Sequence, residues 1–196
     1  MTPRALRLSL RALFASLALG LGGAEAAAQG GPTVGPAQVI SLAAARVNTL
    51  TVTVTSGAVQ TIAAVQDNVV NAFPTPVAIT TQWDVQPGQT NSVTLVGYFT
   101  TPSQAMVGGT VQIPSSRVLG RVTTGAPTTY TAFTQAAVAG AGAAGGSLTL
   151  FTETITGTNK VKARTDNLDL QLNLVGFPDL PVGTYTGTLN IRAVAQ

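Results

Sequence analysis

Apolar and polar residues alternate with a period of two over long stretches of this chain. The clearest stretch is residues 167–176, where every second position is a leucine: Leu168, Leu170, Leu172 and Leu174. Residues 48–57 repeat the pattern, with threonines separating the apolar positions. Successive side chains of a β-strand point to opposite faces of the sheet, so this period predicts strands with one buried and one solvated face. The pattern is typical of antiparallel sheets.

Similar segments recur between turn signals. Further strands are expected at residues 58–66, 77–85, 92–100, 116–123, 128–134, 147–157 and 160–163. The segment 92–100 is apolar on both faces, which predicts a central strand, and the turn at 86–91 predicts that it forms a hairpin with 77–85. The glycine-rich residues 136–146 are expected to form a flexible loop. Residues 39–48 follow neither period cleanly, so they fit either a strand or a short helical turn.

These segments together predict an all-β fold. About eight to ten strands without a helical pattern favour an antiparallel two-sheet sandwich of immunoglobulin-like type, with a closed barrel as the alternative. The closing strand is expected within 181–196, paired with 167–176 through the turn at 177–183. The positions predicted to form the core are Leu50, Val52, Val54, Ile79, Trp83, Leu95, Leu168, Leu170, Leu172, Leu174, Tyr185, Leu189 and Ile191.

The N-terminal residues have the features of a secretory signal peptide. Arg4, Arg7 and Arg11 form a basic head, the apolar run 13–23 follows, and small residues precede Gln29. Such a segment is too short to span a membrane and is removed on export. We therefore divide the chain into a signal peptide (1–28), a flexible leader (29–47) and one β-sandwich domain (48–196). The protein is expected to be periplasmic, on the cell surface or extracellular, with no membrane span after cleavage.

Charge and composition limit the possible partners. The full chain has 10 Lys+Arg and 7 Asp+Glu. Removal of the signal peptide, with its three arginines and Glu25, leaves a nearly neutral protein without a basic stripe. Nucleic acid is therefore not expected as a partner, because binding it requires clustered cationic side chains. Only 9% of the residues are charged, so polar uncharged side chains must cover much of the surface.

The inventory of reactive side chains is short. The chain contains no His and no Cys, which removes the usual general base, the thiolate nucleophile and the usual zinc ligands. We therefore expect no enzymatic activity and no cofactor. Weak candidates for calcium ligands are Asp166, Asn167 and Asp169, whose oxygens lie close together in sequence. Their spacing lacks the regular calcium-loop pattern, and a local salt bridge between Arg164 and Asp166 is the alternative interpretation.

Trp83 is the only tryptophan of the chain. It shares its phase with Val77, Ile79 and Val85, which places it on the dry face of its predicted strand. A core position between the two sheets is therefore expected. The alternative is an exposed platform on which a sugar could stack.

The C-terminus resembles the last strand of bacterial secreted pilin-like sandwiches, which include the chaperone–usher fimbrial subunits and the spore coat protein U group. The resemblance lies in Gly183, fourteenth from the end, in the P-x-G-x-Y sequence at 181–185 and in the final Gln196. Ala195 replaces the usual penultimate aromatic residue, the paired cysteines of many fimbrial subunits are missing, and the leader lacks a clear alternating strand. The resemblance implies donor-strand complementation, in which a neighbour's segment fills the groove of an incomplete sandwich.

These observations lead to three functional hypotheses. The first is a non-enzymatic secreted protein with a self-contained sandwich and a structural or surface-interaction role. The second is a pilin-like subunit that assembles by donor-strand exchange, and the third is a module that binds glycan or cell-wall polymer. Self-association and a cell-surface polymer are accordingly the partners to test.

Overall fold

The computed structural model describes residues 42–196. The predicted signal peptide and most of the leader lie outside this range. The strands are β1 (Thr49–Ser56), β2 (Val70–Ala72), β3 (Val77–Asp84), β4 (Ser92–Tyr98), β5 (Met106–Gly108), β6 (Val111–Ile113), β7 (Val118–Val122), β8 (Thr131–Ala132), β9 (Ser147–Thr154), β10 (Val161–Asn173) and β11 (Asn190–Ala195). Two short 3-10 segments, Pro102–Gln104 and Ser115–Arg117, complete the secondary structure. The predicted all-β, antiparallel class is confirmed.

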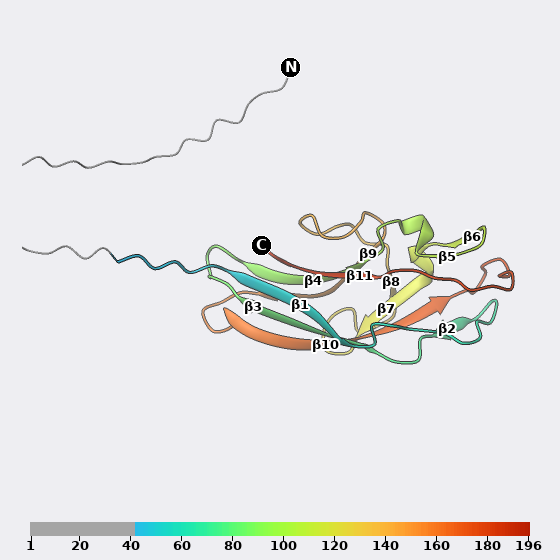
Figure 1. The fold of residues 1–196 in the computed structure, drawn as a ribbon, viewed down its shortest axis with the longest axis horizontal. Helices are drawn as coiled ribbons and strands as arrows, with labels where there is room; N and C mark the ends of the chain where they lie inside the picture. The colour runs from blue at the N-terminus through green and yellow to red at the C-terminus, as the bar shows by residue number, and fades with distance from the viewer. Residues whose placement is uncertain (1–41) are drawn as a thin grey trace, which may run out of the picture. The chain divides into compact units, whose positions relative to one another are not determined.

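The larger sheet has six strands, of which five follow the order β1-β3-β10-β7-β8 (Figure 1). β10 is its longest strand and joins the two segments predicted separately at 160–163 and 167–176. The first part of β10 pairs with β3, whereas its last part pairs with β7 on one side and β2 on the other. The leucines predicted to be inward are buried along this last part.

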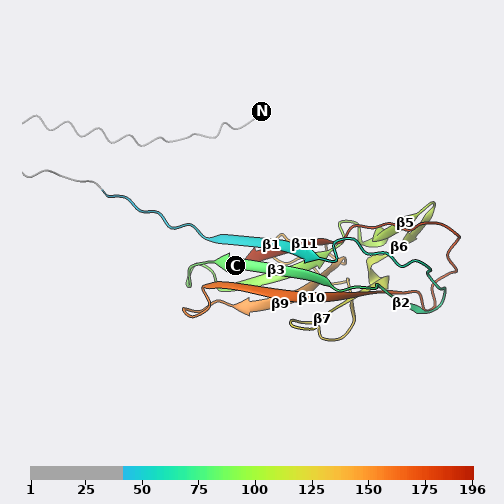
Figure 2. The same ribbon diagram turned by 60° about the horizontal axis from the view of Figure 1, so that its bottom comes forward.

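The second sheet has the order β11-β4-β9 and faces the larger one (Figure 2). β4 lies in its centre and five consecutive residues of it, 93–97, are buried, so the prediction of a central strand is correct. The predicted hairpin with β3 is wrong, because β3 and β4 belong to different sheets. The turn at 86–91 therefore carries the chain from one sheet to the other. Alternation determines which face of a strand is buried, and it leaves the choice of neighbour open.

One apolar core lies between the two sheets. Of the predicted core residues, those buried are Ile79, Trp83, Leu95, Leu168, Leu170, Leu172 and Leu174. Those partly buried and packed against the core are Leu50, Val52, Tyr185, Leu189 and Ile191. Val54 differs from the prediction, since it is 38% exposed. It lies beside the buried Ile79 on the inner face, but β1 is the outermost strand of its sheet and Val54 lines an open groove.

Two further segments differ from the prediction. Residues 58–66 form no strand; instead, Asn71 holds Gln66 through side-chain hydrogen bonds of 2.8 and 2.9 Å to its backbone. The closing strand β11 begins only at Asn190 and pairs with β4, not with 167–176. The second error concerns a partner, β4, that lies far away in sequence, which a local pattern does not specify.

Candidate functional site

The three candidate calcium ligands do not converge in the structure. Asp166 lies on the inner face of β10 and is 1% exposed, whereas Asn167 and Asp169 fall on the opposite phase of the same strand. The carboxylate of Asp166 binds Arg164, and that of Asp169 accepts a hydrogen bond of 2.9 Å from the Nε atom of Arg121. Within residues 42–196 no group of three acidic side chains could hold a metal ion. The salt-bridge interpretation therefore fits the geometry of this segment.

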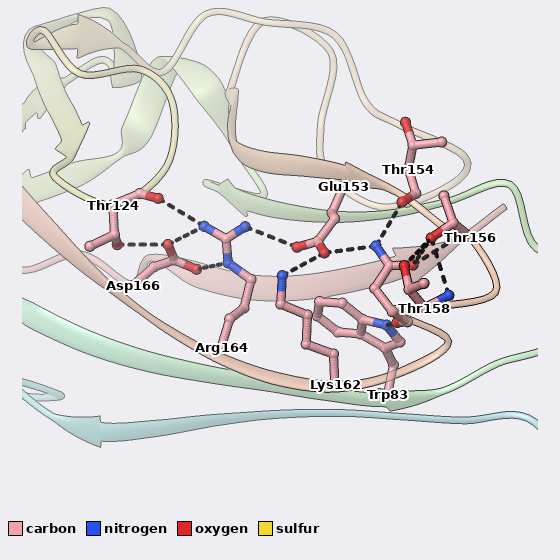
Figure 3. Close-up of polar contacts among 10 residues, drawn as sticks. Trp83, Thr124, Glu153, Thr154, Thr156, Thr158, Lys162, Arg164 and Asp166 are labelled. Atoms are coloured by element: carbon pink, nitrogen blue, oxygen red, sulfur yellow. Dashed lines mark hydrogen bonds and ion pairs between the residues drawn. The ribbon is translucent and has the colours of Figure 1, made fainter.

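Arg164 is the centre of a polar network, which Figure 3 shows. The Asp166 side chain is 1% exposed and that of Arg164 is 19% exposed, whereas that of Lys162 at the end of the network is 41% exposed. Its guanidinium group donates to both carboxylate oxygens of Asp166, at 2.8 and 2.6 Å, and to Glu153 at 3.3 Å. It also donates to the carbonyl oxygen of Thr124 at 3.0 Å and stacks 4.0 Å from the ring centre of Phe151. Arg164 belongs to β10, and Glu153 and Phe151 belong to β9. The network therefore ties the larger sheet to the smaller one.

Glu153 continues the network toward the end of the sandwich. It accepts hydrogen bonds from Lys162 at 2.6 Å and from the amide of Asn159 at 2.9 Å. Burial pushes the pKa of Glu153 upward, but the hydrogen bonds from Lys162, Asn159 and Arg164 together outweigh it and lower the pKa below the ordinary value. The hydrogen bond to Asp166 raises the pKa of Arg164. The lowered pKa of Glu153 and the raised pKa of Arg164 both favour the charged forms of these two groups.

Trp83 borders this network from β3. It is 2% exposed, and its indole N–H donates to the carbonyl oxygen of Asn159 at 2.9 Å. Its ring lies 6.3 Å from that of Phe151, which comes from the opposite sheet. The tryptophan is thus a core residue between the sheets, and it offers no platform for a sugar.

The chemistry of this network is structural. Two cations and two carboxylates neutralise each other, and the four groups are engaged in short hydrogen bonds. Glu153 was not predicted as the partner of Lys162 and Arg164; only a salt bridge between Arg164 and Asp166 was expected. A signal was present, because Lys162, Arg164 and Asp166 repeat with period two and so share one face of a strand. Charged residues on the inner face of a strand indicate a buried network.

A second feature is an apolar groove of about 980 Å³ that opens to the surface. Its floor includes the core side chains of Phe99, Ile113 and Leu170, and its rims include parts of segments 57–67 and 180–189. Its lining is thus largely made of groups that normally lie inside a sandwich. Concave apolar surfaces are common locations for the binding of proteins, peptides and other ligands.

The rim 180–189 has the composition of a strand, but within the described part of the chain it pairs with only one strand. Thr186 exchanges two hydrogen bonds with Val107 of β5, at 2.8 and 3.0 Å. The backbone amides of the adjacent Tyr185 and Gly187 have no acceptor in the part of the chain that the structure describes. Neighbouring residues of an extended segment direct their backbone groups to opposite sides, so these amides face away from β5. They are free to pair with another strand.

Comparisons with protein-family models, with curated proteins and with solved structures found no match. Among the described residues, no helix has the length and hydrophobicity needed to cross a membrane.

Proposed function

We propose that this is an exported, non-enzymatic structural protein whose immunoglobulin-like sandwich binds an extended segment of a second copy of the chain in the apolar groove. The observation that carries the proposal is the rim at 180–189, which has the sequence pattern of a strand but pairs with β5 only at Thr186 and leaves the amides of Tyr185 and Gly187 without an acceptor in the described part of the chain. Strand addition would supply main-chain hydrogen bonds to Tyr185 and Gly187, while alternate side chains of the added strand would fill the groove.

The sequence supports export and an assembling role. The N-terminal 28 residues have the pattern of a signal peptide, and the C-terminal residues resemble the last strand of pilin-like subunits. Tyr185 donates its hydroxyl proton to the carbonyl oxygen of Pro181 at 2.9 Å, a contact of the kind that marks the tyrosine corner of immunoglobulin-like domains. The absence of His and Cys from the sequence supports a non-enzymatic role.

The chain itself offers a segment of suitable chemistry. Residues 42–48 precede β1, belong to no strand or helix and expose apolar side chains; Leu42 is 91% and Val47 is 72% exposed. Exposed apolar side chains on an extended segment are costly for a free monomer and become favourable when buried. We therefore assign the segment 42–48 of a neighbouring copy as the occupant of the groove.

Two alternatives are less well supported. A self-contained sandwich does not account for the open groove or for the free amides of its rim. A glycan-binding module requires an exposed aromatic platform, but its candidate residue, Trp83, is buried in the core.

The test uses one variant on each side of the proposed contact. Val65→Lys places a charge in the groove lining, and Val47→Lys places one on the inserted segment. Head-to-tail association gives open-ended oligomers or closed rings, so sedimentation velocity of residues 29–196 should show species larger than a dimer. Each variant alone should lack these species. A mixture should form a one-to-one pair, because one intact groove and one intact segment remain.

Val59→Lys is the matched control. Val59 lies on the same segment as Val65, is 87% exposed and does not line the groove, so its replacement should leave association unchanged. Wild-type protein that contains no species larger than a dimer at any concentration would refute the proposal. So would an equal loss of the larger species in the Val59 and Val65 variants.

A further inference from the structure

Strand β1 forms an open edge of the larger sheet. It pairs with β3 on one side, and its other side has no strand partner among residues 42–196. The edge of the smaller sheet at β9 is different, because other segments bind it. Gln135 exchanges backbone hydrogen bonds with Ser147, and the amide of Ala126 donates to the carbonyl oxygen of Leu150. The opposite end of the larger sheet is β8, which has only two residues. β1 is thus the long unpaired edge of this sheet.

The β1 edge also lacks the features that usually keep edges from pairing. No charged residue and no proline occurs between Arg46 and Asp67. Natural edge strands are commonly protected by lysine, proline or an early bulge. Here the β-bulge falls after Val54, so the regular edge extends over residues 50–54. Val54 stays 38% exposed on the inner face of this edge, although the adjacent Ile79 is fully buried.

The sequence of β1 is symmetric about Val52 in its polar pattern. Thr51 and Thr53 flank the centre, and the apolar Leu50 and Val54 follow on either side. Two antiparallel copies related by a two-fold axis at Val52 would therefore place Leu50 opposite Val54, Thr51 opposite Thr53, and Val52 opposite itself. Opposed residues of antiparallel strands share a face, so the apolar residues of both copies would meet on the inner face. A shift by one residue would place threonine opposite valine or leucine and lose this match.

We propose that a second copy of the chain pairs with β1 through this register and forms a closed two-fold dimer with a sheet continuous across both copies. Opposed β-branched side chains and threonine pairs stabilise such an edge, and pairing would cover the exposed side chain of Val54. The interface adjoins the groove, because Val54 also belongs to the groove lining. Its backbone hydrogen bonds would come from β1 and not from the rim at 180–189, so they do not require the proposed insertion of a segment there. The short regular edge predicts a reversible dimer.

The test changes the exposed threonines of the outer face, which leaves the core untouched. In the variant Thr51→Lys/Thr53→Lys, each lysine would lie opposite a lysine of the other copy at both positions. Like charges directly opposite each other destabilise strand pairs, so the dimer dissociation constant from sedimentation equilibrium should rise at least ~10-fold. The matched variant Thr51→Lys/Thr53→Glu places opposite charges across the axis and should retain the dimer, with an affinity that falls as salt is added.

A cross-link provides an independent test of the register. The natural chain has no cysteine, and Val52 is the residue of β1 that would face its own copy. Val52→Cys should therefore form a disulfide-linked dimer under mild oxidation, whereas Ser56→Cys should not, because its two copies would lie far apart. Cross-linking of both variants to the same extent would overturn the proposed register.

The outcomes separate this dimer from insertion into the groove. Loss of the dimer in the lysine–lysine variant but not in the Val65→Lys variant supports pairing through β1. A wild-type chain that is monomeric at all concentrations would overturn the proposed dimer, as would equal weakening by the lysine–lysine and lysine–glutamate changes. Larger oligomers that dissociate to monomers in the Val65→Lys variant would overturn it as well, while supporting the groove, because β1 is intact in that variant.

Discussion

Replacement of Arg164 by methionine would leave the carboxylate of Asp166 inside the protein without its cation. Asp166 is 1% exposed and accepts three hydrogen bonds, two from Arg164 and one from the hydroxyl of Thr124 at 2.8 Å. Only the bond from Thr124 would remain. Removing one partner of a buried ion pair costs about 3–5 kcal/mol, because the remaining charge stays desolvated. This is a large part of the ~5–15 kcal/mol that stabilises a typical domain.

Urea denaturation of residues 29–196 measures this free energy of unfolding by linear extrapolation. The control is Arg121→Met, which removes the ion pair with Asp169 on the more exposed face of the same sheet; the Arg121 side chain is 41% exposed. Exposed pairs contribute about 0–1 kcal/mol, so the control should lose much less stability. A second substitution, Asp166→Asn, should restore part of the stability of Arg164→Met, because it removes the unpaired charge while keeping the shape of the side chain.

Both the sign and the size of these changes in the free energy of unfolding are expected from the burial of Asp166. If Arg164→Met and Arg121→Met lost equal stability, of about 1 kcal/mol or less, the ion pairs of Arg164 would not stabilise the packing of the two sheets as their geometry indicates. If Asp166→Asn lowered the stability of the Arg164→Met variant further, the unpaired charge would not be the cause of the loss.

Two further predictions concern acid sensitivity and the extent of the core. The lowered pKa of Glu153 contributes stability above the ordinary glutamate pKa of about 4.3, and this contribution is lost as the pH falls through the lower pKa of the folded state. Glu153→Gln should therefore flatten the acid side of a plot of melting temperature against pH. An unchanged slope would contradict the role given to Glu153. Leu95→Ala should lower the free energy of unfolding by about 2–5 kcal/mol, since Leu95 is fully buried in β4. Val54→Ala at the open edge should lower it by less than about 1 kcal/mol. Similar losses for the two variants in urea denaturation would contradict the difference in burial between Leu95 and Val54.

The local properties of the strands could be predicted from the sequence. The alternation at 167–176 and at 77–85 correctly indicated strands, and their inward residues, from Leu168 to Leu174 and at Trp83, are buried. These features depend on a geometric property of each strand, whose successive side chains point to opposite faces. They therefore need no knowledge of the rest of the fold.

The contacts of the polar network could be predicted from the sequence only in part. Arg164 and Asp166 are two residues apart, and their pairing was considered as an alternative to calcium binding. Glu153 belongs to another sheet, so its contacts with Lys162 and Arg164 follow from how the sheets pack. Side chains that meet across a core come from distant parts of the chain, and a pattern with a period of two contains no information about that distance.

By itself, the sequence determined the all-β class, the inward phase of the leucines in β10 and the lack of histidine and cysteine chemistry. Only the tertiary structure decided that β3 and β4 lie in different sheets, that β11 pairs with β4, and that the segment 180–189 lines a groove with free amides. The physical reason is that a strand's own residues select its buried face, whereas its neighbours are selected by the packing of the whole core. The exposure of Val54 illustrates the difference: its phase is that of a core residue, and its place on the outermost strand leaves it 38% exposed.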